Sequence, residues 1–330
     1  MASIPEASRL ARLAGKDVLL VFVESYGRSA IEGDCCASRT AAALARFQDR
    51  IAASGFTARS GWLTSTTVGG QSWLAHGTLL SGLRVDNQRR YEHLVASDRQ
   101  TLNRDFRRAG WRTVAAMPAI SMAWPEGAFF GYDRIYDAHT SGYRGRPFNW
   151  VTMPDQYTLD ALRRAELAAP VASGRAPVMA EVALISSHAP WTPIPPVIDW
   201  LDVGDGQVFN AWSDSGDPPD VVWRDNARIR DQFSISIAYA LDVLSSYLET
   251  FGTDDTVLIF LGDHQPAPLV TGEDAGHDVP IHILARDPAV IAALDGFGWA
   301  EGMTPDGATP VWPMQAFRAR FVAAMSAPVE

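Results

Sequence analysis

The sequence predicts an α/β fold: a three-layer sandwich in which a mostly parallel central sheet carries helices on both faces. Two nearly continuous apolar runs, Asp17–Val23 and 257–261, have the composition of strands that are buried on both faces. Strand and helix patterns alternate along the chain, as parallel strands with crossover helices require. Helical periodicity is clearest over 226–251, where it is followed by Gly252 as a stop signal.

Composition limits the classes of function. The chain of 330 residues can bury a large core, and its net charge of −10 without a basic tract argues against nucleic acid as a partner. No stretch is long and apolar enough to span a bilayer, and no signal peptide precedes residue 17. Cys35 and Cys36 are adjacent, and since neighbouring cysteines rarely bridge each other, we expect neither a disulfide nor a metal site there. We expect a single catalytic domain over 1–330, with 287–330 as a smaller C-terminal appendage.

Acidic and imidazole side chains follow the two buried strands at their carboxyl ends. Glu24 follows the first strand, and Asp263 and His264 follow Gly262 after the second. Open α/β sheets bind ligands at this edge, and carboxylates with an imidazole suit a divalent metal that compensates their buried charge. We therefore predict that these three side chains converge on one metal. The alternatives are a buried, hydrogen-bonded Asp and a Glu that caps the next helix.

A polar, glycine-rich segment, 64–72, leads into a short helical pattern that contains Leu74, Leu79 and Leu80. Ser72 lies at or near the first turn of this predicted helix. A helix N-terminus presents unpaired N–H groups and the positive end of the helix dipole, which suits a phosphate or sulfate. A serine there is most often only a cap, but beside a metal its alkoxide is a usable nucleophile.

These segments, in this order, resemble the alkaline phosphatase/sulfatase superfamily, and most closely its lipoteichoic acid synthase-like branch of phosphoglycerol and phosphoethanolamine transferases. Glu24, Ser72, Asp263 and His264 match the branch's metal-binding acid, its nucleophile and its late Gly-Asp-His motif. Further segments that resemble the family are 101–114, 130–137, 186–191 and 279–284. The resemblance implies an alkaline phosphatase-like fold. In this branch the catalytic domain usually follows membrane helices and works outside the cytoplasmic membrane.

The sequence departs from the sulfatases that mature a Cys or Ser to formylglycine. Those enzymes carry Pro two residues after the modified residue and Arg four residues after it. Here Leu74 and His76 stand at these offsets from Ser72, although Ser81-Gly82 keeps a later part of the pattern. The maturation signal is therefore absent, which disfavours a formylglycine sulfatase.

The resemblance implies roles for individual residues. Glu24, Ser72, Asp263 and His264 are expected to hold a divalent metal, Mn²⁺ or Zn²⁺, with Ca²⁺ or Mg²⁺ as alternatives and a second metal left open. Ser72 is expected to attack phosphorus and form a covalent intermediate, and His188 to bind the phosphate or protonate the leaving alcohol. Candidate substrate contacts are His277, His76, Trp150 and Arg146, each of which could instead be a structural or solvated residue.

We therefore predict a metal-dependent, phosphodiester-cleaving transferase or hydrolase of the phosphoglycerol type. Its substrate is expected to be an anionic phosphodiester, glycolipid or polysaccharide with a small polar head group. A tryptophan-rich segment, 191–225, is expected to form a long loop near the site that covers a sugar or lipid portion. The alternatives are a sulfuric ester or phosphonate hydrolase of the same superfamily and a catalytically inactive binding module. The expected location is extracytoplasmic, with any membrane association made through segments absent from this chain.

Overall fold

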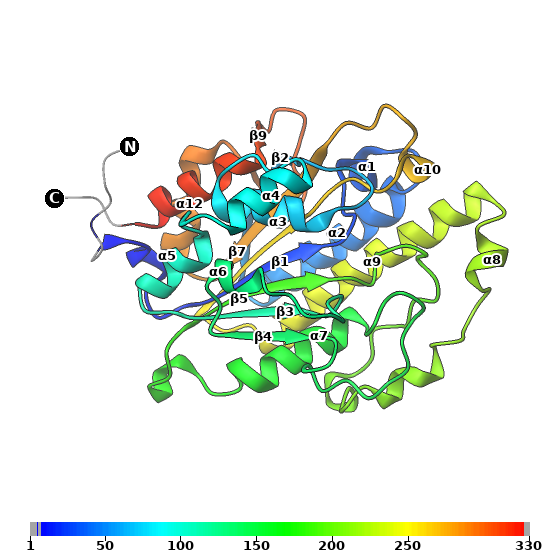
Figure 1. Ribbon diagram of the computed structural model, residues 1–330, viewed down its shortest axis with the longest axis horizontal. Helices are drawn as coiled ribbons and strands as arrows, with labels where there is room; N and C mark the ends of the chain where they lie inside the picture. The colour runs from blue at the N-terminus through cyan, green and yellow to red at the C-terminus, as the bar shows by residue number, and fades with distance from the viewer. Residues whose placement is uncertain (1–4, 6–7, 327–330) are drawn as a thin grey trace.

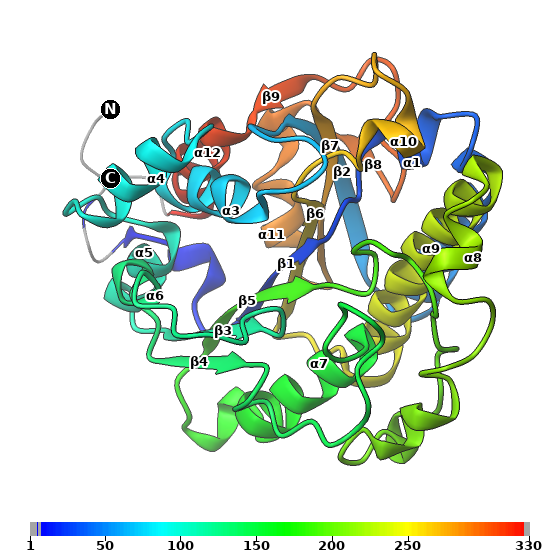
Figure 2. The same cartoon turned by 45° about the vertical axis from the view of Figure 1, so that its right-hand side comes forward.

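The computed structural model describes residue 5 and residues 8–326. A nine-stranded sheet runs through the molecule with helices packed on both of its faces (Figures 1 and 2). The strand order is β4-β3-β5-β1-β6-β7-β2-β8, and β9 pairs with β2. The predicted fold class, a mostly parallel sheet between two helical layers, is confirmed.

The central strands run in one direction, and the direction changes only on one side of the sheet. The strands are β1 (Asp17–Val23), β2 (Thr57–Thr64), β3 (Arg112–Met117), β4 (Arg134–Asp137), β5 (Val178–Leu184), β6 (Thr256–Gly262), β7 (Asp278–Ala285), β8 (Ala300–Glu301) and β9 (Val311–Pro313). β1 pairs in parallel with β5 and β6, and β3 pairs in parallel with β5 and β4. β7 is antiparallel to both β6 and β2, so the carboxyl ends of β1, β2, β5 and β6 lie at the same edge.

The helices divide between the two faces of the sheet. They are α1 (Arg28–Glu32), α2 (Ala37–Ala53), α3 (Ser72–Ser81), α4 (Gln88–Val95), α5 (Leu102–Arg108), α6 (Gly127–Phe130), α7 (Asp155–Leu162), α8 (Pro219–Val222), α9 (Asn226–Phe251), α10 (Pro268–Thr271), α11 (Pro288–Ala292) and α12 (Phe317–Met325). Short 3₁₀ or π turns occupy Ala11–Leu13, Arg163–Leu167, Val171–Ser173, Trp200–Asp202, Gln207–Ala211, Asp295–Phe297 and Met314–Ala316. In the part of the chain that the structure covers, no helix combines the length and apolar character needed to cross a membrane.

Alternate residues of β1 enter two separate hydrophobic cores. Leu19, Val21 and Val23 pack in the core that contains α2, α7 and α9. Val18, Leu20 and Phe22 pack in the core that contains α3, α5 and α12. This division explains why the whole strand is apolar, since a strand with helices on both faces has no solvent-facing side.

The register of β1 and β6 positions the chain that follows them. Val23 lies opposite Gly262, so Glu24 and Asp263 leave the sheet side by side. A Cβ atom on Gly262 would lie 1.8 Å from the carbonyl oxygen of Tyr26, so only glycine permits this approach. The need for glycine is therefore steric and does not come from a left-handed turn at this residue.

Cys35 and Cys36 form a disulfide just before α2, so the expectation that they do not bridge is wrong. That expectation rested on the rarity of bridges between neighbours. Rarity does not forbid such a bridge where the turn between α1 and α2 brings both sulfur atoms together.

The chain after residue 287 contributes strands to the same sheet and a helix to one of its two cores. β8 and β9 extend the sheet beside β2, and α12 packs in the same core as α3. The division into one domain with an appendage at 287–330 stays a prediction, and residues 327–330 lie outside the described part.

Candidate active site

Glu24, Asp263 and His264 meet at the carboxyl edge of the sheet, as β1 and β6 end. One potential ligand atom from each residue lies within 4.8 Å of the other two. His264 Nε2 is 3.2 Å from Glu24 Oε1 and 3.6 Å from Asp263 Oδ2. All three side chains are buried, so the structure brings the predicted metal ligands together in a confined site.

Hydrogen bonds from the surrounding backbone orient these groups. Asp263 Oδ1 accepts the N–H groups of Ser25 at 2.8 Å and of His264 at 2.7 Å, which leaves Oδ2 available to the cluster. His264 Nδ1 donates to the carbonyl of Gln265 at 2.8 Å, so Nε2 is the ring nitrogen that faces the two carboxylates. Such outer contacts fix a histidine and a carboxylate in the geometry that metal binding needs.

Ser72 is the first residue of α3, as its position in the sequence pattern predicts. Its hydroxyl donates to Glu24 Oε2 at 3.0 Å and lies 3.2 Å from His264 Nε2. Gln71, just before it, has a φ of 62°, and Ser25, just after Glu24, has a φ of 60°. Non-glycine residues adopt this left-handed conformation at a cost of about 1–3 kcal/mol, and such strain is characteristic of functional sites.

The charges in the cluster are strongly coupled. Burial raises the pKa of Glu24, but the charge and hydrogen bond of His264 outweigh it and hold this pKa well below its usual range. Burial and the charge of Glu24 raise the pKa of Asp263 to about 6. Burial lowers the pKa of His264, but the two carboxylates raise it to about 10.

The raised pKa values of Asp263 and His264 both reflect two carboxylates that are buried close together. Without a metal, a proton on His264 supplies positive charge beside them. A divalent cation would supply more, and two carboxylates with an imidazole form an established type of donor set for such an ion. The residues present therefore fit the metal that the resemblance implies.

His188 lies in the loop that follows β5 and lines the same cavity as Ser72. Its Nδ1 donates to the carbonyl of Ala189 at 2.6 Å, which leaves Nε2 free for proton transfer. Two contacts hold the loop: Ser187 Oγ donates to the carbonyl of Glu24 at 2.5 Å, and Asp155 Oδ1 accepts the N–H of Ser186 at 2.9 Å. The loop that carries His188 is thus hydrogen-bonded to the backbone of Glu24, the candidate metal ligand.

His76 lies one helical turn after Ser72 and lines the same cavity. Its Nδ1 is 2.8 Å from Oε1 of Glu181, a buried acid in the middle of β5. Its ring stacks on Phe22 with the ring centroids 3.7 Å apart. The structure therefore places His76 beside the candidate nucleophile.

The other candidate substrate contacts lie elsewhere. Trp150 is 78% exposed, and Arg146 is 66% exposed and forms an ion pair with Asp214 at 3.0 Å. His277 is exposed in the segment before β7, where its carbonyl accepts the N–H of Ser65. None of the three candidates lines the cavity beside Ser72.

The tryptophan-rich segment 191–225 packs against the protein and not over Ser72. Trp191 stacks on Trp223, and Trp200 packs edge-on against Tyr247 and Phe251 of α9. No residue of this segment lines the cavity beside Ser72.

A cavity of about 560 Å³ opens beside Ser72. Glu24, Asp263 and His188 lie in its wall together with apolar and aromatic side chains: Phe22, Trp73, Leu80, Tyr91, Met117, Ile120, Trp124, Phe130 and Tyr132. Sequence reasoning missed most of this lining. One signal was present, because Glu181 interrupts an otherwise apolar strand and a buried acid needs a reason.

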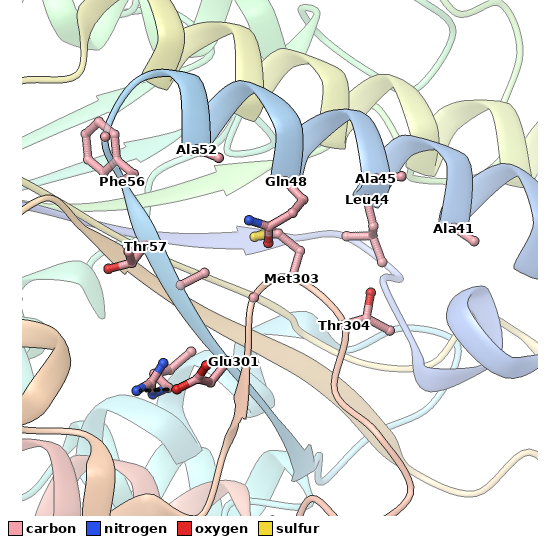
Figure 3. Close-up of a pocket in the computed structure, with 14 residues that line it drawn as sticks. Ala41, Leu44, Ala45, Gln48, Ala52, Phe56, Thr57, Glu301, Met303 and Thr304 are labelled. Atoms are coloured by element: carbon pink, nitrogen blue, oxygen red, sulfur yellow. Dashed lines mark ion pairs between the residues drawn. The ribbon is translucent and has the colours of Figure 1, made fainter.

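A second hollow of about 790 Å³ lies at the opposite edge of the sheet, between α2 and the start of β2 (Figure 3). Its wall contains Ala41, Ala45 and Ala52, and Arg59 pairs with Glu301 at 3.1 Å. The lining contains no histidine and no nucleophile beside a base. The larger hollow is therefore separate from the candidate chemistry.

Comparisons with solved structures show the same fold. The phosphoglycerol transferase GacH of Streptococcus pyogenes, in complex with sn-glycerol-1-phosphate, superposes with a TM-score of 0.60 at 10% identity, over 97% of this chain and 78% of that one. The lipoteichoic acid synthase LtaP of Listeria monocytogenes gives 0.54 at 16% identity, over 86% and 68%. The periplasmic domain of EptC from Escherichia coli gives 0.51 at 13% identity, over 86% and 74%.

No curated protein sequence matches this chain significantly. A family model does match: the model described as Sulfatase covers residues 16–297. The resemblance to the alkaline phosphatase/sulfatase superfamily is thereby confirmed, and this chain belongs to the sulfatase family.

Proposed function

We propose that this protein is a metal-dependent enzyme that cleaves phosphodiesters through Ser72, as a transferase or hydrolase of the phosphoglycerol type. The observation that carries the proposal is the position of the Ser72 hydroxyl, 3.0 Å from Glu24 and 3.2 Å from His264 in the buried cluster. The similarity in fold to a phosphoglycerol transferase and a lipoteichoic acid synthase supports a phosphorus ester as the substrate.

The metal site in this proposal consists of Glu24, Asp263, His264 and Ser72. When bound, a divalent ion lowers the pKa of a hydroxyl ligand and stabilises negative charge on phosphoryl oxygens. We propose Zn²⁺ or Mn²⁺, and a zinc complex of the EptC domain, which has a similar fold, is consistent with the first.

The side chains of this protein divide the chemistry between them. Ser72, after its proton has gone to solvent, attacks phosphorus, and the bond from phosphorus to the ester oxygen breaks. His188 gives its proton to the departing oxygen, which leaves as an alcohol. Water or an acceptor hydroxyl then gives its proton to His188 and attacks the phosphorus. The bond from phosphorus to the Ser72 oxygen breaks, and this oxygen takes a proton back from solvent. Free N–H groups at the start of α3 stabilise the phosphoryl oxygens throughout.

Two features favour phosphorus over sulfate. Leu74 and His76 replace the proline and arginine that accompany formylglycine, so Ser72 stays a serine with a nucleophilic oxygen. His76 is also engaged with Glu181, which gives it a different environment from that of an arginine that binds an anion. We further propose that the domain works outside the cytoplasm, as the periplasmic location of the EptC domain suggests by analogy.

Substrate profiling tests the proposed function. The purified protein, supplied with Mn²⁺ or Zn²⁺, is assayed with matched aryl phosphodiester, phosphomonoester and sulfate ester substrates. We expect the diester to turn over fastest and the intact mass to show unmodified Ser72. Fastest turnover of the sulfate, or formylglycine at residue 72, would overturn the proposal. Fastest turnover of the monoester would replace it with a phosphatase.

A further inference from the structure

We infer that the cavity beside Ser72 binds an apolar, ring-sized group of the substrate that carries no negative charge. This inference rests on the proposed function and concerns one of the two groups esterified to phosphorus. It replaces the small polar head group that the sequence predicts for this position.

The walls of the cavity are unusually rich in aromatic side chains from separate segments. Trp73 comes from α3 and Tyr91 from α4, Phe130 is the last residue of α6, and Trp124 and Tyr132 lie on either side of α6 in the sequence. The rings of Trp124 and Phe130 lie 5.8 Å apart, and those of Trp124 and Tyr132 lie 6.2 Å apart. Flat faces of this kind contact another ring or a hydrocarbon chain over a large area, which is favourable because both surfaces lose water.

The size of the cavity suits such a group. A closed apolar space of about 150 Å³ is enough for benzene, and small-molecule pockets usually measure about 300–1,000 Å³. The cavity of about 560 Å³ therefore has room for a phosphoryl group at the Ser72 end and a ring beyond it. The hydroxyls of a glycerol group in the same place would lose hydrogen bonds to water, and the walls offer few hydrogen-bond partners to replace them.

Charge further restricts the occupant. Beyond the metal cluster, the described lining includes Glu126 and Glu181 and neither arginine nor lysine. Glu181 already accepts hydrogen bonds from Tyr132 and from Asn103 Nδ2, the latter at 3.3 Å, and contacts His76. A negatively charged group that entered the cavity would meet both carboxylates, with no arginine or lysine in the described lining to compensate them.

Glu126 strengthens this restriction. Within residues 8–326 it pairs with no arginine or lysine, and its charge contributes to the raised pKa of Tyr91, after the larger effect of burial. Its carboxylate therefore adds negative charge to the cavity wall with no paired arginine or lysine among these residues. The occupant that fits both the walls and the charge is an apolar ring or chain without an acid.

Binding of phosphonates tests the inference without turnover, because the P–C bond replaces the ester. Three probes share the phosphonate and differ only in the attached group: benzylphosphonate, 4-carboxybenzylphosphonate and 3,4-dihydroxybutylphosphonate, the isostere of glycerol phosphate. We expect the Mn²⁺-loaded protein to bind benzylphosphonate at least about tenfold more tightly than either of the others in calorimetric titrations.

Variants locate the binding to this cavity. Trp124→Ala should weaken benzylphosphonate about tenfold and leave dihydroxybutylphosphonate within about twofold, while Trp124→Phe should retain most of the affinity. Glu126→Gln should strengthen 4-carboxybenzylphosphonate several-fold and leave benzylphosphonate unchanged. Leu201→Ala, a truncation at a residue that is 92% exposed and outside the cavity, is the control and should change none of the affinities. Thermal melting confirms that each variant is folded.

The outcomes separate this inference from the proposed function. Equal affinities for all three probes, or tightest binding of either polar probe, would overturn the inference. The proposed function would stand, because the protein would still bind the phosphonate group. If the metal-loaded protein bound none of the three, the proposed function would fail together with the inference.

Discussion

Two buried histidines at neighbouring strands show how differently one residue type is used in this protein. His264 follows β6, and His282 lies within β7, where it pairs with Phe260 of β6. Their exposed fractions are 1% and 0%. Yet the carboxylates of Asp263 and Glu24 overcome burial and raise the pKa of His264 to about 10, whereas burial alone lowers the pKa of His282 to about 3.

The partners of the two rings explain the contrast. His282 Nδ1 lies 2.7 Å from the hydroxyl of Ser60, and Nε2 lies 3.3 Å from the hydroxyl of Tyr26. Ser60 in turn donates to the carbonyl of Gly302 at 2.6 Å, so neutral groups satisfy this ring. The buried histidine among neutral partners is part of the core, whereas the one between two carboxylates belongs to the candidate metal site.

Removing the hydroxyl beside each histidine should give the largest difference between the two sites. Ser72→Ala should lower turnover by at least about 10³-fold, because the nucleophile is lost. The fold should remain, because a serine at a helix start contributes only about 0.5–2 kcal/mol. Ser72→Thr should retain partial activity, because it keeps a hydroxyl at the same position. Steady-state kinetics on a phosphodiester measure both variants.

Ser60→Ala is the matched control for that experiment. It should keep the turnover number but lower the free energy of unfolding by about 1–3 kcal/mol, since the buried Nδ1 of His282 loses its partner. Full activity in Ser72→Ala would move the nucleophile elsewhere, with Thr66 and Thr67 as the next candidates.

Metal binding should depend on one histidine and not on the other. At a metal concentration of 100 times Kd, the wild-type protein should gain about 2.7 kcal/mol in stability, and chelation should remove that gain. His264→Asn should lose most of the metal-induced rise in Tm. His282→Asn should keep this rise, although its Tm without metal should be lower than that of the wild type. Melting curves with and without Mn²⁺ or Zn²⁺ measure the effect. A rise of the same size in His264→Asn would show that the metal binds at another place.

Acid should destabilise the protein through His282. Its folded-state pKa of about 3 lies below the ordinary value of 6.5, so the unfolded chain binds the proton more readily between these values. Its contribution to stability is therefore present above pH 6.5 and is lost as the pH falls toward 3, by up to about 1.4 kcal/mol per pH unit. Urea unfolding of the wild type and His282→Asn at several pH values measures this slope, which should be shallower in the variant. Equal slopes would contradict the assignment.

In the metal-free protein, the stability contributed by His264 should depend on pH in the opposite direction to that of His282. The folded-state pKa of His264, about 10, lies above its ordinary value of 6.5. Its stabilising contribution is therefore full below pH 6.5 and is lost as the pH rises toward 10. NMR resonances of the histidine rings in the metal-free protein at pH 8 should show His264 charged and His282 neutral. A neutral His264 at this pH would contradict the raised pKa on which the contrast between the two histidines rests.

The smallest effect is expected from Tyr26→Phe. The hydroxyl lies 3.3 Å from His282 Nε2, which is long for a hydrogen bond, so its loss should cost about 1 kcal/mol. Metal affinity should not change, although Tyr26 lies two residues after Glu24. Denaturant unfolding and a metal titration measure the two quantities. A marked loss of metal affinity would show that the sites are coupled through this segment.

Several features of this protein follow from the sequence alone because their causes are local. The apolar runs predict β1 and β6, the helical period predicts the range of α9, and the polar segment before Leu74 predicts where α3 begins. Glu24, Asp263 and His264 could be proposed as one group because strands that run in parallel end at the same edge. The predicted helix start singled out Ser72, and the resemblance to a known family then implied its role as nucleophile and added His188.

Only the tertiary structure decided what surrounds that group. Trp73, Tyr91 and Trp124 belong to different segments, and nothing in their local sequence separates a cavity wall from an ordinary core aromatic. Trp150 and Arg146 carry suitable chemistry, yet packing directs them to solvent. Side-chain type and period are local properties, whereas the direction of a side chain toward one cavity depends on how distant elements pack together.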